Sequence, residues 1–182
     1  MLIGALLSAV SGLALKLADD LVDRVGRRRA SMVPGALAAS TAIASVPAGV
    51  RPEFYLGLIL GNGVVGKIDE PCHGLAAVTV AAGTLLLAPD LDVTALLVVA
   101  LLAAVDELVH PRDPLGLRPV LKVGVVLGWA VGALTAAVTV AALAFDLGYH
   151  LGELVGVRLL ARAAHAPDRG AGRGAEAGGG AG

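Results

Sequence analysis

The chain has 182 residues, of which 57% are hydrophobic, and its mean hydropathy is +0.82. Soluble domains contain about 45–50% apolar residues, so this composition indicates a membrane protein, and the length suits one compact bundle. The net charge of −1 gives no support for nucleic-acid binding, and a single cysteine, Cys72, excludes an intrachain disulfide.

The apolar runs predict transmembrane helices in an all-α bundle. Several runs approach or exceed the ~20 residues that a helix needs to cross the hydrocarbon core, and the period-2 alternation of a membrane barrel is absent. The first run lacks a positively charged start and a convincing cleavage site, so we interpret it as a retained helix. In chain order the helices run from residue 2 to the arginines that end at 29, and then over about 31–49, 54–66, 71–88 and 93–110.

The last apolar stretch, from Pro119 to Arg162, is too long for one crossing. As a single helix it would extend about 66 Å, roughly twice the hydrocarbon thickness. We expect two helices that break near residues 132–135. Residues 1–165 then form one transmembrane domain, and the Gly/Ala-rich segment 166–182 is expected to be a disordered cytoplasmic tail.

Lysines and arginines predict the orientation. Placing the arginines at 24–29 in the cytoplasm puts the N-terminus outside, and seven crossings then bring the cations from Lys67 to Arg162 inside, with only Arg51 outside. Seven crossings also place the C-terminus in the cytoplasm, whereas six would leave the tail on the far side. The charge rule therefore favours about seven transmembrane helices within a range of five to seven.

Four polar patches fall on the cytoplasmic side of this topology. They read DDLVD at 19–23, KIDEPCH at 67–73, DELVH at 106–110 and FDLGYHLGE at 145–153. Residues three and four apart share a helix face, so each patch presents carboxylates on one stripe and three of the patches add an imidazole. Such groups are costly in lipid unless they line a cavity, pair with other charges or bind a metal.

Two of these patches contain Glu-x-x-His, the spacing that aims both ligands inward in the di-metal sites of helix bundles. Imidazole with carboxylate suits zinc, iron or manganese better than magnesium, and all four divalent metals stay open as the cofactor. The candidate metal ligands are Asp19, Asp20, Asp23, Asp69, Glu70, His73, Asp106, Glu107 and His110.

The first patch, Asp19-Asp20-Leu21-Val22-Asp23, resembles the DDxxD motif of prenyl-diphosphate enzymes. In that family the aspartates of the motif hold magnesium against a diphosphate, and the resemblance implies the same role for these residues. The similarity covers five residues, the membrane prenyltransferases are longer, and DELVH is a poor substitute for their second aspartate-rich motif. We therefore do not assign the chain to that family.

Cations and a deep acidic patch complete the predicted site. Four cations are placed to meet phosphate oxygens, namely Lys16, Lys67, Arg118 and Lys122. Asp146 would lie about 18 Å along its helix from Arg158, too deep for an interfacial charge. The candidate catalytic residues are His150, Asp146 and Glu153, with His150 or a carboxylate that holds no metal as the general base.

Each patch also has an interpretation that involves no function. The DDLVD segment is also typical of a membrane-exit end with surface ion pairs, and charged residues are common near interfaces. The GLILGNGVVG segment is expected to permit close helix packing rather than nucleotide binding, and Phe54, Tyr55 and Trp129 are expected to be packing or interface anchors.

The favoured hypothesis is a multi-pass cell-membrane enzyme, metal-dependent and acting from the cytoplasm as a transferase or hydrolase of lipid metabolism. Its substrate would be a lipid or isoprenoid phosphate. The alternatives are a divalent-cation or proton-coupled transporter, and a structural subunit of a membrane complex. Membrane lipid is the expected surrounding partner, nucleic acid is excluded, and a homo-oligomer is left open.

Overall fold

The computed structural model describes residues 1–110 and 119–164, with side chains for residues 1–110 and 119–156. This part of the chain consists of seven helices and has no strands, which confirms the all-α prediction. The helices are α1 (Leu2–Asp23), α2 (Arg28–Ser45), α3 (Pro52–Val64), α4 (Pro71–Leu87), α5 (Val93–Val109), α6 (Pro119–Ala130) and α7 (Ala136–Ala164).

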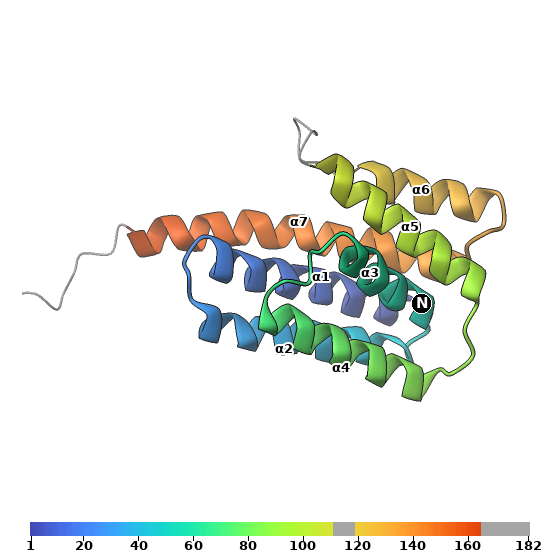
Figure 1. Cartoon of the computed structure of the whole chain (residues 1–182), viewed down its shortest axis with the longest axis horizontal. Coiled ribbons are helices and arrows are strands. Elements are labelled where there is room, and N and C mark those ends of the chain that lie inside the picture. The colour runs from blue at the N-terminus through green and yellow to red at the C-terminus, as the bar shows by residue number, and fades with distance from the viewer. Residues whose placement is uncertain (111–118, 165–182) are drawn as a thin grey trace, which may run out of the picture.

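The helices alternate in direction and form a ring (Figure 1). Going around it, α1 packs against α2, α2 against α4, α4 against α3, α3 against α5, α5 against α6, α6 against α7, and α7 back against α1. Chain order and ring order therefore differ, because α4 lies between α2 and α3. Helices α1, α3 and α5 end, and α2, α4 and α6 begin, at one end of the ring. We call this end the charged end and the other one the opposite end.

Glycines let the backbones of two helix pairs approach closely. A Cβ atom on Gly12 of α1 would collide with the carbonyl of Phe145, and one on Gly148 of α7 would collide with the carbonyl of Ala9. A Cβ atom on Gly61 of α3 would likewise collide with a backbone carbonyl of α5. Small residues serve this purpose where helices pack in apolar surroundings. The packing interpretation of GLILGNGVVG is confirmed, and α3 runs through this segment as far as Val64.

The break predicted within 119–162 is confirmed. The chain ends α6 at Ala130, turns with Gly132 at a φ of 77°, and starts α7 at Ala136. A left-handed φ is accessible to glycine without a steric cost, so this residue fits the turn. The second helix differs from the expectation in its bounds, because it ends at Ser45 and residues 46–49 form a turn.

The helix count does not by itself give the number of membrane crossings. Among the described residues, two helical segments are long and apolar enough to cross a membrane, Leu2–Asp23 and Ala136–Gly156. Helices α3 and α6 have 13 and 12 residues, about 20 Å and 18 Å, against a hydrocarbon core of about 30 Å. Much of α3 is buried in the bundle, where a short helix does not need to span lipid.

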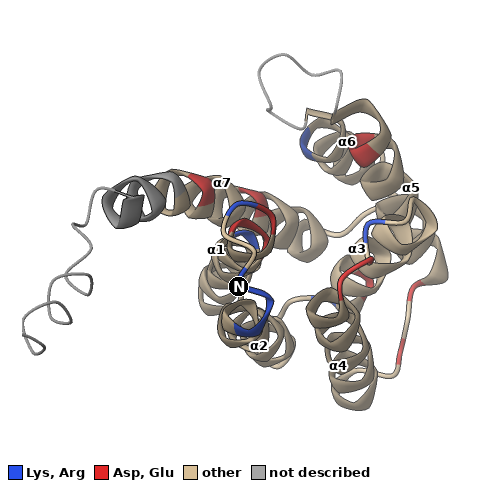
Figure 2. Ribbon diagram, turned by 60° about the vertical axis from the view of Figure 1, so that its left-hand side comes forward, with Lys and Arg blue, Asp and Glu red and all other residues tan. Residues whose placement is uncertain are grey.

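The apolar core lies toward the opposite end. Phe54 and Val99 are fully buried there, and Phe54 packs against the rings of Tyr55 and Phe145 with centroids 4.8 and 5.7 Å apart. Phe54 and Tyr55 are thus packing residues, as expected. Large apolar side chains also cover the outside of the bundle, for example Leu86 at 84% exposure. Acidic and basic residues gather at helix ends and in loops, while the helix shafts carry few charges (Figure 2).

Candidate functional site

A cavity of about 590 Å³ lies inside the ring, and all seven helices contribute to its wall. Near the charged end its wall includes exposed side chains such as Asp69 and Lys67, so the cavity communicates with solvent there. Toward the opposite end the wall is mostly apolar and includes Leu58, Val80 and Phe145. The cavity therefore has a charged mouth and an apolar interior.

Most of the predicted site residues line this one cavity, although they come from distant parts of the sequence. They are Lys16, Asp19, Asp23, Lys67, Asp69, His73, Asp106, Glu107, His110, Asp146, His150 and Glu153. All three imidazoles that we singled out are among them. Seven carboxylates face two lysines along this wall, so the mouth has an excess of negative charge.

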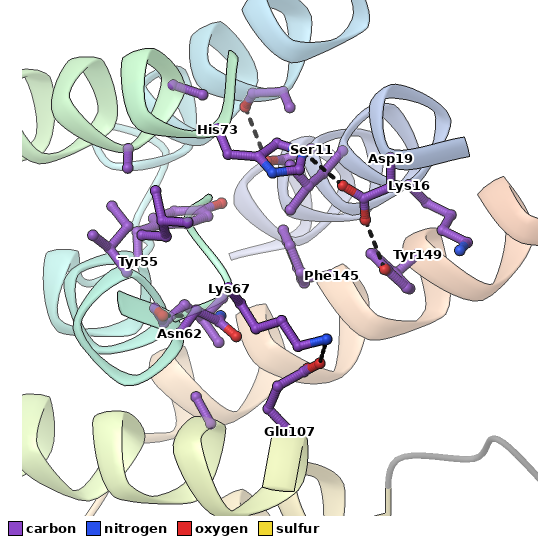
Figure 3. Close-up of a pocket in the computed structure, with 18 of the residues that line it drawn as sticks. Ser11, Lys16, Asp19, Tyr55, Asn62, Lys67, His73, Glu107, Phe145 and Tyr149 are labelled. Carbon is purple, nitrogen blue, oxygen red and sulfur yellow. Dashed lines mark hydrogen bonds and ion pairs between the residues drawn. The ribbon is translucent and has the colours of Figure 1, made fainter. Parts of the chain in front are cut away.

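Asp19 on α1 connects three helices at the mouth (Figure 3). One of its carboxylate oxygens lies 2.9 Å from Nε2 of His73 on α4, and the other accepts a hydrogen bond of 2.8 Å from the hydroxyl of Tyr149 on α7. Nδ1 of His73 lies 3.9 Å from Asp69. The Lys16 ammonium is placed 5.3 Å from the centroid of the Tyr149 ring. A carboxylate that faces an imidazole holds the ring in a fixed orientation, as an acid–base group requires.

A second polar group joins α6 to α7. The ammonium of Lys122 lies 3.2 Å from an Asp146 carboxylate oxygen and 3.0 Å from Nε2 of His150, and the same Asp146 oxygen lies 3.6 Å from that Nε2. An ammonium group only donates, so in this contact Nε2 of His150 accepts the hydrogen bond from Lys122.

The two Glu-x-x-His pairs have different surroundings. Glu70 precedes α4 as its N-cap residue and bonds to Arg28 at 2.9 Å, away from the cavity wall. Glu107 does line the cavity, but it pairs with Lys67 at 2.8 Å (Figure 3). Within residues 1–110 and 119–164 no three His, Cys, Asp or Glu side chains are grouped to hold a metal ion.

Three further predicted residues lie apart from the wall or beyond the described chain. Asp20 is buried between Lys16 and Arg24, at 3.2 and 3.1 Å, and is not part of the cavity wall. Lys122 contacts Asp146 from behind the wall. Arg118 lies outside the described residues, as does the predicted tail at 166–182.

Asp106 serves a structural purpose that the motif did not reveal. It is buried, and its carboxylate accepts a hydrogen bond of 3.0 Å from the backbone N–H of Leu121 in the first turn of α6. A carboxylate at a helix N-terminus satisfies an N–H that the helix itself leaves unpaired. This contact fixes the start of α6 against the end of α5.

Sequence reasoning missed two tyrosines of the cavity wall. Tyr149 lies three residues after Asp146 and four before Glu153, so helical spacing would have placed it on the same stripe. Tyr55 carries no such signal, because its hydrogen-bond partners Ser8 and Ser45 are on other helices. Both partners look like ordinary small helix residues in the sequence.

A separate ion pair lies at the opposite end of the bundle. Arg51 donates two hydrogen bonds to the buried Glu53, at 3.2 and 2.7 Å, and Glu53 also accepts a 2.7 Å bond from the backbone N–H of Asp92. The hydrogen bond to Glu53 raises the pKa of Arg51, and nearby carboxylates add to this against the effect of burial. The pair ties the turn before α3 to the loop before α5.

Comparison of the chain with protein families, with curated proteins and with solved structures finds no match. Polar and ionisable groups surround the mouth of the cavity, and hydrocarbon side chains line most of its interior.

Proposed function

We propose that this protein is a multi-pass membrane enzyme that acts from the cytoplasm on a lipid or isoprenoid phosphate, with a divalent metal as cofactor. The observation that carries the proposal is the single cavity in which acids, imidazoles and lysines at the mouth adjoin an apolar interior. Its volume of about 590 Å³ is within the ~300–1,000 Å³ typical of small-molecule sites.

The alternating helices and the apolar exterior support the proposed membrane arrangement. A bundle whose outer surface exposes side chains such as Leu86 and Val131 is suited to lipid. The charged end contains the arginines of the α1–α2 turn, which the charge rule places in the cytoplasm. The cavity mouth then faces the cytoplasm, and the hydrocarbon part of a substrate lies at membrane depth.

Magnesium or manganese is the metal that best fits the observed geometry. Mg²⁺ usually keeps several waters and is held by one or two carboxylates together with substrate phosphates, so it does not need a preformed protein cage. Asp19 and Asp23 line the mouth and would share such an ion, and Lys16 and Lys67 on the same wall would contact phosphate oxygens. The excess of carboxylates at the mouth makes a cation necessary before an anionic headgroup can approach.

His73 is the imidazole best placed for acid–base work. It faces the Asp19 carboxylate at 2.9 Å, while the basic nitrogen of His150 contacts Lys122. An imidazole positioned by a carboxylate is the usual general base in hydrolysis and group transfer. His150 would take this part only after Lys122 moves toward the substrate.

Binding of farnesyl diphosphate to the full chain in nanodiscs tests the proposal. We expect Mg²⁺ to tighten binding at least about tenfold, equivalent to about 1.4 kcal/mol. Asp23→Asn should remove this Mg²⁺ effect, because Asp23 is exposed at the mouth. Asp90→Asn is the matched control, since it makes the same change at an exposed site of the opposite end. Absence of binding, or a Mg²⁺ effect that survives Asp23→Asn, would contradict the proposal.

A second candidate function is cation or proton transport. The observation in its favour is the Lys122, Asp146 and His150 group, which places titratable side chains well inside α7. The packed opposite end counts against it, because a transporter needs access from both sides. Cation flux in liposomes that Asp146→Asn abolishes would favour transport over the enzyme.

A further inference from the structure

The apolar interior of the cavity has a closed end. The wall residues nearest the opposite end on their helices are Ser11, Ala42, Tyr55, Val80, Ala103 and Phe145. Past this level the bundle is filled by core side chains, including the fully buried Phe54 and Val99. A hydrocarbon chain that enters at the mouth therefore meets a closed floor before it reaches the opposite end of the bundle.

Tyr55 is the largest polar side chain at this floor, and its hydroxyl is fully occupied. Ser45 donates its own proton to the Ala42 carbonyl at 2.6 Å, so the Tyr55 hydroxyl donates to Ser45 at 3.0 Å. Ser8, 2.9 Å away, then donates to the Tyr55 oxygen. Each hydroxyl proton has one acceptor in this chain of bonds. The network has no proton left for a ligand, so its effect is to fix the ring.

Packing fixes the ring from the other side as well. Tyr55 is 3% exposed, and its ring lies against that of Phe54, which in turn meets Phe145 edge-on. Tyr55 and the charged residues Asp19 and Lys16 lie on opposite sides of the cavity (Figure 3). Protein interiors at this density do not yield to an extra methylene without a cost, so the floor acts as a rigid stop.

We infer that Tyr55 limits the length of the hydrocarbon chain that the cavity accepts. The inference rests on the proposed function, which supplies the phosphate at the mouth. A headgroup held near Asp19 and a floor at Tyr55 fix two ends of the ligand. The distance between them then selects chain length.

The test uses geranyl, farnesyl and geranylgeranyl diphosphate, with two, three and four isoprene units, bound with Mg²⁺ to the full chain in nanodiscs. The wild-type protein should show a cut-off in chain length. Tyr55→Ala should strengthen binding of the first chain beyond the cut-off by about tenfold or more, because one methylene changes recognition in an apolar pocket by ~10–200-fold. Tyr55→Phe keeps the ring and should leave the cut-off unchanged.

A second variant moves the floor in the other direction. Ala42→Leu adds bulk from α2 at the same level and should weaken the longest accepted chain while sparing the shortest. It retains the Tyr55 network, so it remains informative if Tyr55→Ala does not fold. A wild-type protein that binds all three chains equally, or a cut-off that neither variant shifts, overturns the chain-length inference alone. Failure of every prenyl diphosphate to bind overturns the proposed function as well.

Discussion

Removing Arg51 should destabilise the protein strongly, because it leaves the Glu53 carboxylate buried and short of partners. Glu53 is 1% exposed and accepts two of its hydrogen bonds from Arg51 and one from the backbone of Asp92. Breaking a buried ion pair by removing one partner costs ~3–5 kcal/mol. The Arg51 side chain is 42% exposed, so solvent screening places the expected cost of Arg51→Ala at the lower end, about 3 kcal/mol.

Thermal unfolding of the protein in nanodiscs measures this cost. A chain of this size loses ~2–4 °C in Tm per kcal/mol, so Arg51→Ala should lower Tm by about 6–12 °C. The double variant Arg51→Ala with Glu53→Gln should recover most of the loss, because a neutral amide still accepts the Asp92 N–H and leaves no buried charge. A double variant as unstable as Arg51→Ala, or a single variant within ~1 °C of wild type, would refute the reasoning.

The pH dependence of this contact has a definite sign. The pKa of Arg51 is raised in the folded protein, so the stabilisation is fully present below the unfolded pKa and is lost only as pH rises through the folded value. A guanidinium group stays protonated throughout this range, so the Tm difference between wild type and Arg51→Ala should stay constant from about pH 7 to pH 10. A difference that fades across this alkaline range would show that Arg51 is not the group responsible.

Further predictions concern the glycine contact, the α6–α7 turn and the polar group of α7. Gly148→Val should separate α1 from α7 and lower the free energy of unfolding by at least ~1–3 kcal/mol. Gly35 has open space around it, so Gly35→Ala should be neutral or stabilising by up to ~1 kcal/mol. Thermal unfolding of both variants in nanodiscs compares the two effects. Gly132→Ala should cost ~1–2 kcal/mol in the same assay because its φ is 77°, and an unchanged Tm would mean that the turn adopts another conformation. Lys122→Met should lower Tm because the mostly buried Asp146 loses the Lys122 ammonium. Adding Asp146→Asn should restore part of the lost Tm. If Tm is not restored, Lys122 has a role other than pairing with Asp146.

Local sequence patterns predicted the elements and the grouping of charges. The break near Gly132 followed from the length of the apolar stretch, and it is where the structure places it. The gathering of His73, His110 and His150 around one cavity followed from alternating helices, which return every second helix end to the same side. The prediction that these residues bind metal or act in catalysis stays a prediction.

The pairing of individual side chains was not predictable in the same way. Glu70 and Glu107 have the same Glu-x-x-His context, but Glu70 precedes its helix and meets Arg28, while Glu107 meets Lys67. Each partner is supplied by a helix or loop remote in sequence. A motif describes spacing along one helix, and it contains no information about which cation is opposite.

The amino-acid sequence alone determined that this protein is helical and apolar, where its longest apolar stretch breaks, and that most of its charges collect at one end, because these depend on composition and on periodicity within a helix. Only the tertiary structure decided the order of helices around the ring, the closed floor at Tyr55 and the partner of each acid. Those features depend on which surfaces fit together, and that fit is set by contacts such as Gly12 against Phe145, between residues far apart in the chain.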